Sequence, residues 1–88
     1  MSARVSTQRR TRAKQDSPDP ALACALRRLR HDSGTSQEEL AYRAGITTAS
    51  FSRIERGEAN PAWTTVIRIA SALDISLAEL VVAVEDAV

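Results

Sequence analysis

The chain has 88 residues, a length that supports one small core rather than two domains with a catalytic cleft between them. Its charges are nearly balanced, with 12 Lys and Arg against 11 Asp and Glu. Cys24 is the single cysteine, which excludes an intrachain disulfide or a CxxC metal pair and is typical of a reducing, cytoplasmic setting. No apolar run approaches the roughly 18 residues of a transmembrane helix, and no signal-peptide pattern is present.

The first residues form a basic segment that differs from the rest of the chain. Residues 1–16 contain five Lys and Arg and one acid, a net charge of +4, whereas the remaining residues carry seven bases and ten acids, a net charge of −3. Too few apolar residues precede Pro20 to offset the entropy lost on ordering this segment. We therefore predict a disordered basic N-terminal arm over residues 1–19 and one folded domain over residues 20–88.

Helical patterns begin at the start of this domain. A first helix, which ends at Gly34, is predicted from apolar residues at helical spacing. These residues are Leu22, Leu26 and Leu29. Ser36 and Glu39 have the spacing of a capping box, in which the serine accepts a free backbone N–H and the glutamate reaches back. They predict a second helix of about two turns, because Gly45 supplies the conformation that ends a helix.

Three further helices are predicted. The third directs Phe51 and Ile54 inward, so its outer face carries small, polar and cationic residues, namely Ala49, Ser52, Arg53 and Arg56. The fourth has an apolar stripe made of Val66, Ile69, Ala70 and Leu73. Trp63 flanks this stripe, and we expect it in the core. Ser76 and Glu79 repeat the capping-box spacing and predict a fifth helix, with an apolar face made of Leu77, Leu80, Val81 and Val84.

The second and third helices are separated by a short turn, Gly45-Ile46-Thr47. Such a turn sets the second of two helices across the first and projects its outer face, and a helix presented in this way fits the major groove of DNA. The chain resembles the phage-repressor-like (Cro/C1, XRE) helix-turn-helix family in segments that keep their mutual spacing. These are Leu26, Leu29, Arg30 and Gly34; Ser36-Gln37-Glu38-Glu39-Leu40-Ala41; Ala44-Gly45-Ile46; Ser52-Arg53-Ile54-Glu55-Arg56-Gly57; and Asn60-Pro61. The resemblance implies an all-α fold, a compact five-helix lambda-repressor-like DNA-binding domain with its helix-turn-helix at helices 2 and 3.

The resemblance also implies which residues contact DNA. Base edges would be read by Thr48, Ala49, Ser50, Ser52 and Arg53. Phosphates would be contacted by Ser36, Gln37, Arg43, Thr47 and Arg56. The chemistry agrees, because Arg53 can donate two hydrogen bonds to guanine, and Gln37 places an amide donor at a helix N-terminus that attracts phosphate. Arg30 and Glu55 are expected to form a structural ion pair, as the family pairs these positions.

The end of the chain predicts self-association. Val82, Ala83 and Val88 extend the apolar surface of the fifth helix beyond the face that seals its own core, so we predict that they form a dimer interface. Two-fold pairing there would set two reading helices about 34–36 Å apart, one turn of B-DNA. Three departures from the family are expected to lower local stability: Thr35 where leucine is usual, Ala62 before the fourth helix and Asp74 after it.

These patterns together predict a sequence-specific DNA-binding transcriptional regulator, most simply a repressor, that binds a near-palindromic operator as a homodimer. The alternative is an antitoxin or another protein-binding transcriptional cofactor of the same fold, with a toxin or other protein as its partner. The basic arm either adds contacts to phosphates or the minor groove or only keeps the chain soluble. No enzymatic activity or metal site is expected, because His31 has no second His, paired Cys or carboxylate constellation to act with. No cofactor, small-molecule ligand or membrane partner is expected either.

Overall fold

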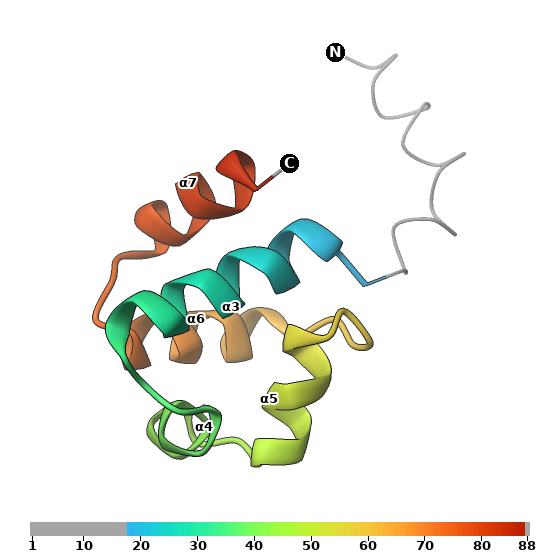
Figure 1. The fold of residues 1–88 in the computed structure, drawn as a ribbon, viewed down its shortest axis with the longest axis vertical. Helices are drawn as coiled ribbons and strands as arrows, with labels where there is room; N and C mark the ends of the chain where they lie inside the picture. The colour runs from blue at the N-terminus through green and yellow to red at the C-terminus, as the bar shows by residue number, and fades with distance from the viewer. Residues whose placement is uncertain (1–17, 88) are drawn as a thin grey trace.

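The computed structural model describes residues 18–87, and within this range the chain forms five helices and no strand (Figure 1). They are α3 (Pro20–Ser33), α4 (Gln37–Ala44), α5 (Thr48–Glu55), α6 (Trp63–Ala72) and α7 (Leu77–Asp86). The predicted all-α, five-helix fold is confirmed. The predictions for residues 1–17 and for Val88 lie outside the described residues.

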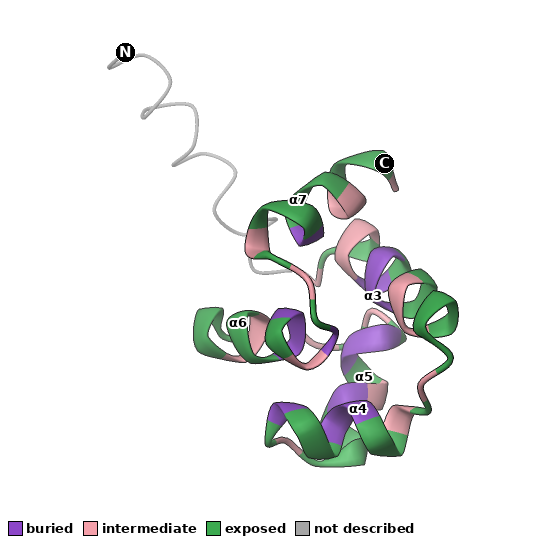
Figure 2. Cartoon of the chain, turned by 90° about the vertical axis from the view of Figure 1, so that its left-hand side faces the viewer, coloured by how far each residue is buried: buried purple, intermediate pink, exposed green. Residues whose placement is uncertain are grey.

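α3 runs through the middle of the domain. In both Figures 1 and 2, α7 lies on one side of α3, whereas α4 and α5 lie on the other. Each helix contributes a large side chain to one shared core, and these are Leu26, Leu40, Phe51, Ile69 and Leu80. Burial of each stabilises the fold by roughly 2 kcal/mol. The core therefore holds the α4–α5 segment and α7 at opposite ends of the domain.

The start of α3 is tied to the loop that precedes α6. Asp19 is the N-cap of α3, because its Oδ1 accepts the backbone N–H of Ala21 at 2.9 Å. The backbone N–H of Asp19 also donates to Oδ1 of Asn60 at 3.1 Å. Asp19 was predicted to belong to the arm, but this pair of hydrogen bonds places it with the folded domain.

The two serine caps differ in how they are completed. At α7, Ser76 accepts the N–H of Glu79 at 3.0 Å and donates its own N–H to the Glu79 carboxylate at 2.7 Å, so the predicted capping box forms. At α4, Ser36 accepts the N–H of Glu39 at 3.0 Å, but the Glu39 carboxylate pairs with Arg43. The predicted box is only half formed there, because a guanidinium one helical turn away is a stronger partner than a backbone N–H.

Apolar residues on α6 and α7 lie differently from the prediction. Trp63, expected in the core, is 64% exposed, because it is the first residue of α6 and helical side chains lean toward the N-terminus. α6 begins after Ala62 without a side-chain cap, as expected. Val81 is also exposed, since α7 buries Leu80 and Val81 lies one step around the helix. Together with Val82, which is 53% exposed, these side chains leave apolar surface uncovered in the monomer.

Asp74 follows α6 in the left-handed region, with φ of +60°. Asparagine tolerates this conformation and lacks the negative charge that is unfavourable at a helix C-terminus, so Asp74→Asn is expected to raise the free energy of unfolding by about 0.5 kcal/mol. Urea denaturation followed by circular dichroism measures the change. Asp32→Asn is the control, because Asp32 lies in the last turn of α3 within the helix and loses the same charge without a left-handed backbone. An equal rise in the free energy of unfolding in the two variants would show that the left-handed backbone of Asp74 contributes nothing to the effect.

Candidate nucleic-acid interface

The turn between α4 and α5 fixes the direction in which α5 leaves α4. Gly45 adopts φ of +74°, a conformation that a Cβ would strain. The N–H of Ile46 then donates to the carbonyl of Ala41 at 3.0 Å. Thr47 caps α5 by accepting the N–H of Ser50 at its hydroxyl, also at 3.0 Å. Every step of the turn is therefore held by a local hydrogen bond or by glycine.

α5 buries one side and exposes the other. Phe51 and Ile54 are buried in the core. The five residues predicted to read bases lie on the solvent side: Thr48, Ala49, Ser50 and Arg53 are exposed and Ser52 is half-buried. The structure thus brings this predicted set together on one helix surface, and their contacts with DNA stay a prediction.

A buried ion pair anchors the end of α5. The Glu55 side chain is only 2% exposed, and its carboxylate accepts hydrogen bonds from Arg30 Nε at 2.6 Å, Arg30 Nη2 at 3.1 Å and Gln37 Nε2 at 2.8 Å. Arg27 Nη1 donates to the backbone carbonyl of Glu55 at 2.8 Å. Arg30 and Glu55 therefore form the ion pair that the family resemblance implies, and the network joins α3, α4 and α5. Among the residues described, no buried side-chain nitrogen or oxygen lacks a hydrogen-bond partner.

Three of the predicted phosphate contacts lie at the beginnings of α4 and α5. Ser36 and Thr47 each use a hydroxyl oxygen to accept a backbone N–H, which leaves the hydroxyl hydrogen to donate. The Gln37 amide donates one N–H to Glu55 and has a second N–H. All three donors accompany a helix N-terminus, whose partial positive charge favours an anion.

The other two predicted phosphate contacts are arginines held by carboxylates. Arg43 pairs with Glu39 one turn earlier on α4, and Arg56 donates from Nε and Nη2 to Glu58 at 2.9 and 3.0 Å. Hydrogen bonding from Arg56, together with the charges of Arg56 and Arg53, lowers the pKa of Glu58, so its carboxylate is ionised at neutral pH. Glu39 and Glu58 were not predicted as neighbours of these cations. The i,i+4 spacing of Glu39 and Arg43 is a signal that could have found the first pair, whereas the second depends on how the chain turns after α5.

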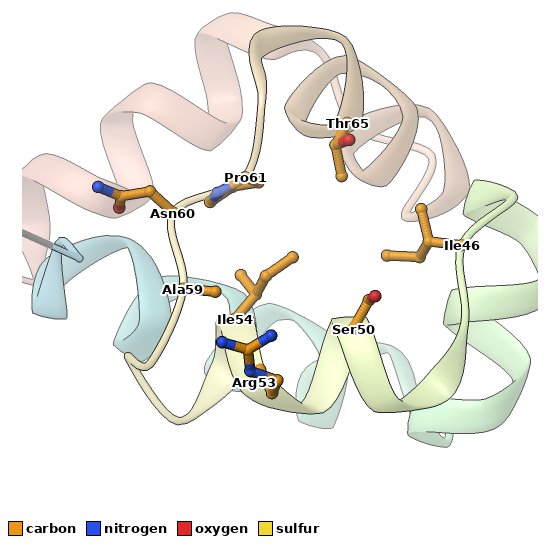
Figure 3. Close-up of a pocket in the computed structure, with 8 residues that line it drawn as sticks. All are labelled: Ile46, Ser50, Arg53, Ile54, Ala59, Asn60, Pro61 and Thr65. Atoms are coloured by element: carbon orange, nitrogen blue, oxygen red, sulfur yellow. The ribbon is translucent and has the colours of Figure 1, made fainter. Parts of the chain in front are cut away.

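A pocket of about 210 Å³ lies beside the outer face of α5 (Figure 3). It is lined by Ile46, Ser50, Arg53, Ile54, Ala59, Asn60, Pro61 and Thr65. Figure 3 shows Arg53 on α5 beside Ala59 of the following loop, with Thr65 across the hollow on α6. Thr65 has no predicted role, because the pocket exists only once the loop before α6 has folded against α5.

A family described as "Helix-turn-helix domain" matches residues 21–82, which include all of α4, the turn and α5. The chain belongs to this helix-turn-helix family. The predicted resemblance to phage-repressor-like proteins is confirmed, and so is the predicted class of function, a DNA-binding transcriptional regulator. The matched family is a DNA-binding fold rather than an enzyme family.

Three relatives of this helix-turn-helix chain illustrate the range of similar proteins. An uncharacterised HTH-type transcriptional regulator, y4dJ, of Sinorhizobium fredii is 43% identical over 54 residues, which cover 61% of this chain and 70% of that protein. Antitoxin HipB of Escherichia coli is 36% identical over 56 residues, 64% of this chain and 60% of HipB. The crystal structure of the restriction-modification controller protein C.AhdI of Aeromonas hydrophila matches with a TM-score of 0.67 at 36% identity, covering 69% of this chain and 92% of that one.

Two of the three residues predicted for the dimer, Val82 and Ala83, lie on α7, on the side of α3 away from the helix-turn-helix, and the third, Val88, lies outside the described residues. Val82 is exposed and Ala83 is half-buried. A second apolar surface lies next to them, a groove of about 200 Å³ between α7 and the starts of α3 and α6. Its apolar lining consists of Leu22, Trp63, Val66, Leu77, Leu80, Val81 and Val84, with Asp19 and Glu85 beside it. The uncovered apolar surface of α7 is therefore wider than the sequence indicates.

No three His, Cys, Asp or Glu side chains within residues 18–87 come together in a way that could hold a metal ion. None of the helices there combines the length and the apolar character needed to cross a membrane. The groups that the helix-turn-helix presents to a ligand are hydrogen-bond donors and the starts of two helices.

Proposed function

We propose that this chain is a repressor that binds operator DNA by laying α5 in the major groove. The observation that carries the proposal is the outer surface of α5, which is small, polar and cationic while Phe51 and Glu55 fix the helix from behind. Repression requires only that the bound protein occupy its site. An α-helix of this width fits the major groove, where each base pair presents a distinct set of donors and acceptors.

The residues of α5 and its surroundings have separate roles in this proposal. Arg53 donates two hydrogen bonds to guanine O6 and N7, and Ala49 offers only a methyl contact, for instance to thymine. Ser36, Gln37 and Thr47 donate to phosphates and fix the register of the helix without reading sequence. The pocket between Arg53 and Thr65, lined by both polar and apolar side chains, lies beside this reading surface.

The proposed repressor is a homodimer that pairs through α7. Val82 and Ala83 line one side of α7 together with Leu29, whereas Val81 and Trp63 line the groove on another side. In the proposed dimer a second copy covers the two adjacent exposed valines, Val81 and Val82. Because α3 separates α7 from α5, this pairing leaves both reading helices outward (Figure 1). A spacing of about 34–36 Å between them matches one turn of B-DNA and requires a near-palindromic site.

Val81→Lys combined with Val82→Lys is expected to give a folded monomer with weaker operator binding. Both side chains are about half exposed, so the lysines remain solvated in the monomer but would be buried in the dimer. Sedimentation velocity at tens of micromolar protein measures the oligomeric state, and Tyr42→Lys, on α4, is the control for a charge placed at an exposed apolar residue elsewhere. A parent that is already monomeric, with a double variant that binds operator equally well, would place the interface elsewhere.

The proposal is tested by selecting bound duplexes from a random DNA pool with the full chain. We expect a motif made of two inverted half-sites whose centres lie about one helical turn apart, with a guanine in each half-site. Retention of the pool without any enriched motif would show binding to phosphates alone and would overturn sequence-specific recognition.

A second function, neutralisation of a partner protein, is favoured by the similarity to Antitoxin HipB. Under this alternative the chain is an antitoxin, and the apolar surface on α7 binds a toxin instead of a second copy. A toxin-like reading frame next to the gene, whose product forms a stoichiometric complex with the purified chain, would support it. Absence of complex formation with the product of the neighbouring gene would leave the repressor proposal as the better one.

A further inference from the structure

The predicted DNA face contains three arginines in two different electrostatic states. Arg43 is paired with Glu39, and Arg56 is paired with Glu58. Among the residues described, Arg53 forms no ion pair. The residue predicted to read a base therefore has no carboxylate in direct contact, although its charge also acts on Glu58, whereas the two arginines predicted to contact phosphates are each paired with a carboxylate.

These two ion pairs are accessible and exchangeable. All four side chains are about half exposed, in contrast to the buried pair of Arg30 and Glu55. A carboxylate and a phosphate bind the same guanidinium N–H groups in the same planar geometry. The Nε and Nη2 groups of Arg56 are both occupied by Glu58, and these are donors that a phosphate would take. Phosphate binding must therefore displace the carboxylate or share the guanidinium with it.

We propose that Glu39 and Glu58 compete with the DNA backbone for Arg43 and Arg56. This competition lowers the sequence-independent part of the affinity for DNA. The inference rests on the proposed function, because it concerns the same DNA face. An arginine paired with a carboxylate carries no net charge and so releases no condensed counterion from DNA. Each carboxylate therefore removes about one cation from those that contribute to the salt-dependent part of the binding free energy. Base reading by Arg53 then supplies a larger share of the affinity than it would on a fully cationic surface.

Glu58→Gln and Glu39→Gln test this directly, since each keeps the shape of the side chain and removes its charge. Each variant is expected to bind both the selected operator and a random duplex about two- to eightfold more tightly at 0.1 M salt, which corresponds to up to one additional phosphate contact. The slope of log affinity against log salt should become steeper by up to about 0.9. The gain should be equal on both DNAs because phosphate contacts carry no sequence information.

A double-mutant cycle separates competition for the arginine from a general charge effect. In an Arg56→Gln background, Glu58→Gln should increase the affinity for DNA by a smaller factor than it does beside the native Arg56. Equal gains in both backgrounds would overturn the proposal, because Glu58 would then act on DNA only through bulk charge. Weaker binding by Glu58→Gln would also overturn it, because the carboxylate would then orient Arg56 for phosphate instead of competing with it.

The same measurements separate this inference from the proposed function. A parent chain that binds neither operator nor random DNA would overturn both. A parent that binds operator specifically, together with carboxamide variants of unchanged affinity and salt slope, would overturn only the competition. Circular dichroism of each variant is expected to match the parent, because both carboxylates lie on the surface and outside the core.

Discussion

Arg30→Met is expected to lower the free energy of unfolding by about 3–5 kcal/mol. The methionine keeps the apolar stem of Arg30 but removes the guanidinium that donates twice to Glu55, and the Glu55 carboxylate is almost fully buried. An uncompensated buried charge is among the most destabilising changes that a single substitution can make. Urea denaturation followed by circular dichroism measures the loss, and the helix content at zero urea shows whether the variant folds.

The double variant Arg30→Met with Glu55→Gln is the control for this prediction. Removal of both charges leaves a neutral amide that Gln37 can still contact, so the double variant should recover a large part of the lost stability. A loss below about 1 kcal/mol in the single variant would be typical of a surface pair and would contradict the buried network.

Arg53→Ala is expected to lower the affinity for the selected operator by about 1–3 kcal/mol, as for the loss of a bidentate guanine contact. Arg53 is exposed on α5, so the fold should keep its stability. A selection with the variant should show relaxed preference at one base pair in each half-site and the parental motif elsewhere. Gln37→Ala, the matched phosphate variant, should weaken binding to all sequences alike. An unchanged motif from the Arg53 variant would show that another residue reads that base.

Much of the fold can be predicted from the sequence because the ends of its helices are set locally. Glycines stop two of the helices, and serine or threonine caps begin three of them, so boundaries follow from neighbouring residues. The apolar spacing then identifies Phe51 and Ile54 as the inner side of α5, which assigns the outer side by exclusion. The predicted base-contacting residues are consequently found on one surface.

What the sequence did not predict depends on how helices pack and which side chains compete. Trp63 is exposed because α6 begins at that residue, and the apolar pattern does not reveal that the core ends there. Glu39 leaves its capping box for Arg43, and Glu58 takes Arg56 after the loop has folded. At Glu39 the capping box and the i,i+4 ion pair both have the required spacing, and the stronger guanidinium of Arg43 takes the carboxylate, which the capping-box spacing alone does not show.

Reading of guanine by Arg53 is tested most directly by replacing the guanine of each half-site with 7-deazaguanine, which lacks the N7 acceptor. The parent should lose about 1 kcal/mol of affinity per half-site, roughly fivefold, because one of two hydrogen bonds is removed. Arg53→Ala should bind the modified and the unmodified operator equally well, because it makes neither bond. An equal loss in the parent and the variant would contradict the assignment of α5 and Arg53 as the reader of the operator.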